Sequence, residues 1–214
     1  MKKIVGVLLF ITFSITGLYA QKDQKALQIL DAMSAKYKSM PAFKVDFQYS
    51  IENPSSGIND TFKGEIVIKA SKFRLKMDGQ EIINNGSTVW TYLIEENEVN
   101  ISDYTPTEDE VSPSTIYTVY KNGYKYLFVE EKKEDGQVYE IVELIPEDKS
   151  RQVFKIRLQI HKKDKYIKNW RIFEKSGTRY FCNITKTTPN VKVEENYFAF
   201  DASKHKGVEV IDLR

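Results

Sequence analysis

The amino-acid sequence predicts a mainly β fold, an incomplete antiparallel β-barrel of about eleven strands covered by an N-terminal helix and a short inserted helix. Three observations predict it. Segments of alternating apolar and polar residues recur along the chain, polar turns separate most of them, and only two segments show helical spacing. Because 41% of the residues are hydrophobic and 29% are charged, the chain is globular rather than disordered.

The N-terminus has the pattern of a secretory signal peptide. Lys2 and Lys3 precede an apolar run over residues 4–18, and the small residue Ala20 precedes the polar Gln21. A transmembrane anchor is the alternative, but the run is shorter than the roughly 20 residues that span a bilayer. We therefore expect cleavage after Ala20, export of the chain, and one domain over residues 21–214. Position 21 is not a cysteine, so we expect no lipid anchor on the chain itself.

The first element of the mature chain is an amphipathic helix. Between Lys22 and Met40 apolar residues recur at steps of three and four, and Pro41 ends the pattern. The apolar stripe consists of Ala26, Leu27, Ile29, Leu30, Met33 and Tyr37.

After Pro41 the period changes to two, which is typical of a strand with one buried face. Phe43, Val45, Phe47 and Tyr49 alternate with polar residues. Further strands are expected over residues 66–68, 73–77, 89–93, 99–101, 124–129, 138–144, 154–160, 166–173, 179–185, 197–200 and 208–211. Their sequence, with polar turns between most of them, favours an antiparallel meander over a βαβ fold.

The stretch between Tyr104 and Tyr124 is too long for a hairpin loop. Ser112 is suited to a helix N-cap, Pro113 to the first helical position and Gly123 to the C′ position. Apolar residues at helical spacing complete the pattern, namely Ile116, Tyr117, Val119 and Tyr120. We expect a second, short helix over residues 113–120.

Aromatic residues are frequent at the predicted strand positions, and they suggest an apolar interior. A large twisted sheet tends to curl, so that one alternating face lines the inside. That inside is either a core packed with side chains or a space for one apolar ligand, and the alternation alone does not decide between them.

Composition excludes several function classes. Without Lys2 and Lys3, the 32 basic residues become 30 against 30 acidic ones, so nucleic-acid binding is not expected. One cysteine, Cys182, and two histidines, His161 and His205, leave little basis for a metal site or cofactor. No phosphate-binding glycine loop or nucleophile motif is present, so we do not expect an enzyme. Cys182 lies among strand residues and is expected to be buried and unreactive.

Several local motifs, in this order, resemble the LolA family of periplasmic outer-membrane lipoprotein carriers over nearly the whole mature chain. They are Phe43, Phe47 and Gln48; residues 64–69 with Phe73 and Arg74; residues 85–92; residues 198–200; and residues 207–210. Each motif is weak alone, but together, behind a signal peptide, they are moderately specific.

The resemblance implies a half-open barrel whose cavity shields the acyl chains of lipoproteins between an inner-membrane ABC transporter and an outer-membrane acceptor. We expect a monomer. With the alternation, it implies an acyl-chain site formed by Phe43, Phe47, Phe73, Met77, Trp90 and Tyr92. It implies a lid formed by Leu30, Met33, Ile116, Tyr117 and Tyr120. The chain departs from the family at Ala70 and Ser71, where many members carry an Arg and a Pro, and that Arg holds the lid shut.

Two other functions fit the same fold. The chain could be an envelope-stress sensor of lipidated or misfolded proteins, or an accessory protein that binds a free lipid. The sequence does not identify the cargo.

Overall fold

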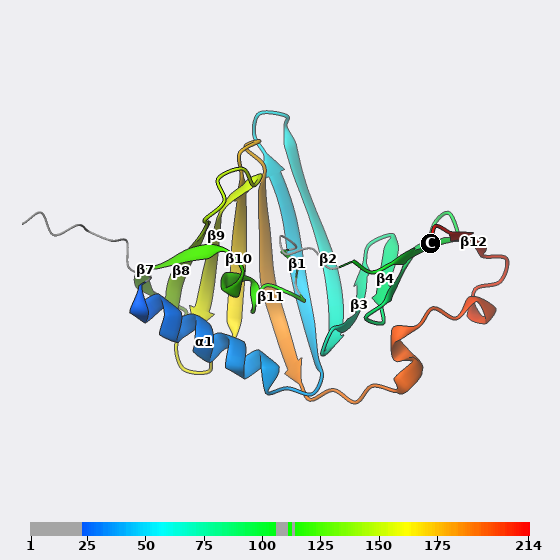
Figure 1. Ribbon diagram of the computed structural model, residues 1–214, viewed down its shortest axis with the longest axis horizontal. Helices are drawn as coiled ribbons and strands as arrows, with labels where there is room; N and C mark the ends of the chain where they lie inside the picture. Colours follow the sequence, from blue (N-terminus) through cyan, green and yellow to red (C-terminus); the bar gives the residue numbers. More distant parts are fainter. Residues whose placement is uncertain (1–22, 106–110, 113) are drawn as a thin grey trace, which may run out of the picture.

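The computed structural model describes residues 23–105, 111–112 and 114–214, and the predicted signal peptide lies outside them. Within these residues one α-helix, α1 (Gln24–Lys38), packs against a single sheet of twelve strands (Figure 1). The strands are β1 (Phe43–Asn53), β2 (Ile58–Lys69), β3 (Lys72–Met77), β4 (Gln80–Asn84), β5 (Thr88–Leu93), β6 (Glu98–Asp103), β7 (Tyr124–Glu134), β8 (Gln137–Pro146), β9 (Val153–His161), β10 (Ile167–Glu174), β11 (Arg179–Pro189) and β12 (Glu209–Asp212).

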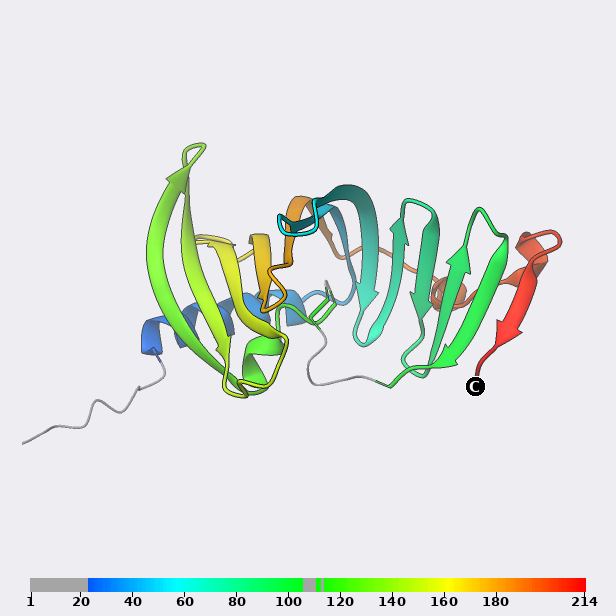
Figure 2. The same ribbon diagram turned by 90° about the horizontal axis from the view of Figure 1, so that it is seen from above.

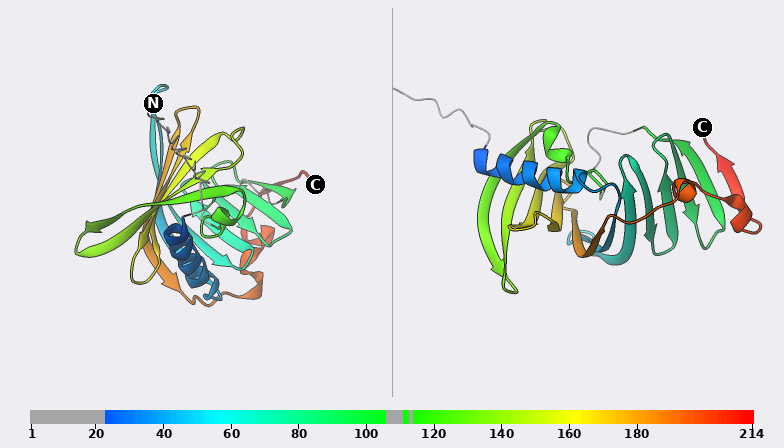
Figure 3. Two further views of the ribbon diagram at one scale, coloured as in Figure 1. Left: turned by 60° about the vertical axis from the view of Figure 1, so that its left-hand side comes forward. Right: turned by 90° about the horizontal axis from the view of Figure 1, so that it is seen from below.

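The sheet is a meander whose two arms meet at β1. The spatial order is β12-β6-β5-β4-β3-β2-β1-β11-β10-β9-β8-β7, so β1 pairs with both β2 and β11. All neighbouring strands are antiparallel except β12, which pairs with β6 in parallel. The sheet curls but does not close, as Figure 3 shows from two sides, and this confirms the predicted incomplete barrel.

Helix α1 has a defined start. Asp23 is its N-cap, and its Oδ1 accepts the N–H groups of Lys25 and Ala26 at 2.9 and 3.1 Å. The side chains of the predicted apolar stripe, including Leu30 and Met33, are buried against the sheet, except for Leu27, which is partly buried.

The two faces of the sheet have separate cores. We call the face that α1 contacts the inner face, and the opposite one the outer face. The main core lies on the inner face and includes Phe43, Phe47 and Ile66. A smaller core lies on the outer face around Val67 and Ile83. Since Ile66 and Val67 are adjacent in β2, their side chains point to opposite faces.

The outer core is covered by the C-terminal strap, residues 190–208. Phe198 is 3% exposed against Val67 and Ile83, and Trp90 packs beside them. Residues 197–200, predicted as a strand, instead form part of a 3₁₀ helix (Glu195–Phe198) followed by extended chain. Figure 2 shows this strap running from the end of β11 to β12 at the other end of the sheet.

The segment predicted as a short α-helix over residues 113–120 is a series of turns ending in a 3₁₀ helix, Val119–Lys121, and Pro113 lies outside the described residues. The Ile116 and Val119 N–H groups donate to the carbonyls of Ser112 and Thr115, each four residues back, at 2.9 and 3.0 Å. β-Branched residues at 115, 116, 118 and 119 have low helix propensity, which explains why the bonds do not extend into a regular helix. Gly123 has the positive φ, 68°, that its predicted C′ position requires.

Candidate functional site

The inner face beneath α1 is closed in this structure. Phe43 and Phe47 from β1 are 3% and 4% exposed, and they belong to the same core as Leu30 and Met33 of α1. Ile116, Tyr117 and Tyr120 complete this cover, at 2%, 9% and 3% exposed. All five predicted lid residues therefore pack on the inner face, and side chains fill the space where the sequence predicts a cavity.

Stacked aromatic rings join the cover to the sheet. The Tyr37 ring lies parallel to Tyr117, with 5.1 Å between centroids, and meets Phe43 edge-on at 5.3 Å. The backbone N–H of Ile167 donates to Tyr37 Oη at 3.2 Å. Burial raises the pKa of Tyr37, so its hydroxyl stays neutral.

Two polar contacts fix the cover in place. Tyr120 Oη donates to Asp31 Oδ1 of α1 at 2.5 Å, which links the 112–121 segment to the helix. Burial, and then the Asp31 carboxylate, raise the pKa of Tyr120. Asp23 Oδ2 accepts the backbone N–H of Phe128 in β7 at 2.9 Å, and this bond is the first cause of a lowered pKa at Asp23.

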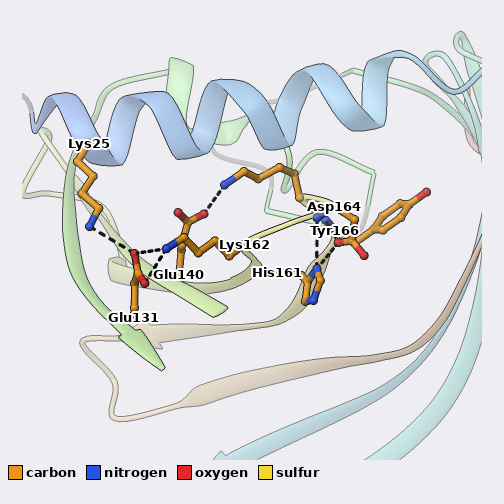
Figure 4. Close-up of polar contacts among 8 residues, drawn as sticks. Lys25, Glu131, Glu140, His161, Lys162, Asp164 and Tyr166 are labelled. Atoms are coloured by element: carbon orange, nitrogen blue, oxygen red, sulfur yellow. Dashed lines mark hydrogen bonds and ion pairs between the residues drawn. The ribbon is translucent and has the colours of Figure 1, made fainter. Parts of the chain in front are cut away.

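Ion pairs lie along one flank of α1, as the close-up in Figure 4 shows. Glu131 of β7 pairs with Lys162 at 2.8 Å and lies 3.7 Å from Lys25 of the helix. Glu140, only 5% exposed, pairs with Lys165 at 2.5 Å. These charged residues form the boundary of the apolar part of the inner face along this flank of α1.

The inner face remains partly open over β3–β5. Phe73, Leu75 and Met77 of β3 are half-buried and pack against the edge of the main core. Gly64 of β2 lies beside them, where a Cβ would come within 2.6 Å of the Phe47 ring. Only glycine lets that ring lie flat on the strand, so Gly64 fixes the boundary between the closed and open parts.

Trp90 and Tyr92 do not belong to this site, which corrects the prediction. Asn84 pairs with both Phe73 and Val89, so Val89 shares the inner face with Phe73 and Trp90 faces outward. Trp90 packs in the outer core, and Tyr92 contacts Phe200 and His205 of the strap at 5.3 and 4.5 Å between ring centroids.

Some inner-face residues were missed by sequence reasoning. Trp170 and Leu158, 3% and 0% exposed, lie in the main core, and strict alternation within β9 and β10 could have placed them there. Asp31 carries no sequence signal, because a charged residue on a helix is ordinarily solvated. Cys182 is buried on the inner face and burial raises its thiol pKa, as expected.

Among the described residues, neither histidine belongs to an arrangement for catalysis. His161 is bonded through both ring nitrogens, to Asp164 and Gln137, and His205 stacks on Phe200 at 4.6 Å. Both are partly buried rather than exposed as their lysine neighbours suggest. In the part of the chain that the structure describes, no group of His, Cys, Asp and Glu could hold a metal ion. No described helix has the length and apolarity to cross a bilayer.

Within the described residues, the molecule is an open curled sheet whose apolar inner face lies beneath a helix. The family model described as outer membrane lipoprotein carrier protein LolA matches residues 38–201. The chain belongs to this family, which is one of carrier proteins. No curated protein matches the sequence significantly.

A solved structure with a TM-score above 0.5 has the same fold. An uncharacterized conserved protein from Thermus thermophilus is similar with a TM-score of 0.60 at 13% identity, over 88% of this chain and 99% of that one. A LolA superfamily protein from Nitrosomonas europaea has a TM-score of 0.45 at 12% identity, over 82% and 98% of the two chains. Lipoprotein LppX from Mycobacterium tuberculosis has a TM-score of 0.49 at 11% identity, over 80% and 100%.

Proposed function

We propose that this protein is an envelope carrier that shields the acyl chains of lipoproteins and delivers them from an inner-membrane ABC transporter to an outer-membrane acceptor. The family supports this role. The observation that carries it is the inner face itself, whose apolar surface is partly open over β3–β5 and partly closed by a cover of separate segments.

Acyl chains bind along this face, first over β3 and then beneath the cover. Each methylene removed from water contributes about 0.8 kcal/mol, so a sixteen-carbon chain contributes on the order of 10 kcal/mol. That gain suffices to displace side chains such as Tyr117 and Ile116 from the sheet. Phe73 and Met77 contact the first part of the chain, and Phe43 and Phe47 contact the part under the cover.

The mature protein begins at Gln21 and works in the periplasm, where a cargo with exposed acyl chains would otherwise aggregate. N-terminal sequencing of protein from the periplasmic fraction tests this directly. Met1 retained in a membrane fraction would contradict it.

The binding experiment uses a purified triacylated lipoprotein diluted from detergent with or without the mature protein. We expect a soluble one-to-one complex. Leu75→Gln, on the open inner face, should reduce its yield severalfold, because a polar amide would meet the acyl chain. Ile94→Gln is the matched control, since Ile94 is 50% exposed outside this face.

A protein that binds free fatty acid but leaves the lipoprotein aggregated would be a lipid-binding accessory instead. Equal losses in the two variants would contradict the inner face as the binding site.

A further inference from the structure

A groove of about 400 Å³ lies on the outer face of β7–β11, on the side of the sheet away from α1. Ile141 and Gln159 form its floor and are 6% and 8% exposed. Its remaining lining residues are Glu130, Lys132, Glu134, Arg157, Asn169, Arg171 and Phe181. Within the described part of the chain, no segment covers this groove in the way that the strap covers the outer face of β3–β5.

Two arginines stand directly opposite each other across this groove. Arg171 of β10 is the register partner of Arg157 of β9, and like charges in such positions destabilise a sheet. Glu143 neutralises Arg157 by accepting its Nε and Nη2 hydrogens at 2.9 and 2.5 Å. Arg171 has no such carboxylate among the described residues, and its guanidinium lies over the Phe181 ring at 4.9 Å.

Apart from Glu130, the other polar side chains of the groove are already bonded. Asn169 Nδ2 donates to Gln159 Oε1 at 2.9 Å, and Gln159 Nε2 donates to Glu134 Oε2 at 3.2 Å. Glu134 in turn pairs with Lys132 at 2.8 Å. Among the described lining residues, Arg171 is therefore the cation without a carboxylate partner. A guanidinium stacked on an aromatic ring keeps its planar edge available for a carboxylate.

We propose that this groove docks an acidic segment of a partner protein, with a carboxylate on Arg171 and an apolar side chain on Phe181 and Ile141. The rim carboxylates Glu130 and Glu134 would repel the many charges of an anionic bilayer surface more strongly than the few charges of a short acidic segment. The groove lies on the face opposite the inner face. A partner can therefore be held while the inner face is occupied, and the docking does not depend on what the inner face binds.

The test follows the arginine Nε–H signals of the mature protein by ¹H–¹⁵N NMR. The probes are the blocked peptide acetyl-Phe-Glu-Glu-Ile-amide and its twin with two glutamines. We expect saturable shifts at Arg171 with the acidic peptide and not with its twin. Arg171→Gln should weaken binding about tenfold or more, because hydrogen bonds between charged groups are lost. Arg179→Gln, an exposed arginine outside the groove lining, should change it less than about twofold.

Several outcomes would overturn the proposal. Equal shifts from both peptides, or none from either, would exclude carboxylate recognition. Inorganic phosphate that shifts Arg171 as strongly as the peptide would indicate a simple anion site. Binding to phosphatidylglycerol vesicles that falls in Arg171→Gln would assign the groove to a lipid surface. A thermal unfolding midpoint equal to wild type in Arg171→Gln shows that altered binding is not misfolding.

Discussion

The two halves of the sheet are covered on opposite faces. In the half formed by β7–β11 and β1, helix α1 and the 112–121 segment seal the inner face, and the outer face is open. In the half formed by β3–β6, the strap seals the outer face, and the inner face is open. Figure 2 shows the helix and the strap over different stretches of the sheet.

The two covers are built differently. The α1 cover is held by aromatic packing and by single polar bonds such as Tyr120 to Asp31. The strap is held by its buried aromatic residues and by one bond to a part-buried ion pair of the sheet: Arg74 of β3 bonds Glu81 of β4 at 2.7 and 2.9 Å and donates to the carbonyl of Tyr197 at 3.0 Å. Since the inner face is the one proposed to take up acyl chains, we expect α1 to be the cover that moves and the strap to stay in place.

The largest expected effect comes from the packing of α1. Leu30→Ala removes a fully buried side chain and should lower the free energy of unfolding by about 3 kcal/mol. Chemical denaturation measures this loss, and Trp170 in the main core should respond more than Trp90 in the outer core. Leu27→Ala, at a partly buried position of the same helix, is the control and should cost under about 1 kcal/mol. Equal responses at both tryptophans would mean that the halves are one cooperative unit.

The next effect concerns the strap. Arg74→Met leaves Glu81, whose side chain is 9% exposed, without its main partner and should cost about 2 kcal/mol. Trp90 fluorescence should shift toward that of a hydrated indole, while lipoprotein binding stays intact. Lys76→Met removes a half-exposed lysine 3.7 Å from the same carboxylate and should cost far less. Unchanged Trp90 emission in Arg74→Met would refute the ion pair as the anchor of the strap.

A smaller effect is expected for the hydroxyl that ties α1 to its neighbour. Tyr120→Phe should cost about 1 kcal/mol and increase hydrogen exchange of the α1 amides about fivefold. Uptake of an acyl chain should accelerate to a similar degree. Tyr117→Phe removes a hydroxyl with no hydrogen bond to another described side chain and should leave both rates near wild type. If the two variants behave alike, the Asp31 contact does not restrain the cover.

The smallest effect is a pH dependence at Asp23. Its folded pKa is lowered below 3.8, mainly by the bond from the Phe128 N–H. Its contribution is therefore complete above about pH 3.8 and is lost as the pH falls through the lower folded value. The hydrogen-exchange protection factors of the first turn of α1 should fall in that range. Asp23→Asn should show protection factors that are lower by about threefold and independent of pH, because an amide oxygen caps the helix less strongly than a carboxylate. Wild-type protection factors without this fall would contradict the role of the carboxylate.

The sequence was sufficient for helix α1 and most of the strands but not for the assignment of faces across strands. Phe43, Phe47 and Phe73 were placed correctly, because alternation and one tight hairpin connect them. Trp90 was misplaced because its face depends on β4, which was not predicted, and on the length of the turn after Asn84. A change of one residue there reverses every side chain that follows.

The sequence also could not predict how segments without a periodic pattern cover the sheet. The strap has no repeating pattern. Its aromatic residues at 197–200 have the spacing of a strand, and only the structure shows that they pack against the outer core. The Asp31 to Tyr120 bond joins residues far apart in the chain, and neither has a local signal. Such contacts depend on tertiary placement rather than on local propensity.

The reactivity of Cys182 can report how often the inner face opens. It is the single cysteine of the chain, fully buried on the inner face, with a thiol pKa raised by burial. A thiol reagent can reach it only while the inner face is exposed, so the alkylation rate is the intrinsic rate multiplied by the fraction of open molecules. The alkylation rate of the wild-type protein therefore measures, without any added label, how often the inner face is exposed to water. A bound acyl chain should slow the alkylation of Cys182 in proportion to the fraction of protein that is occupied.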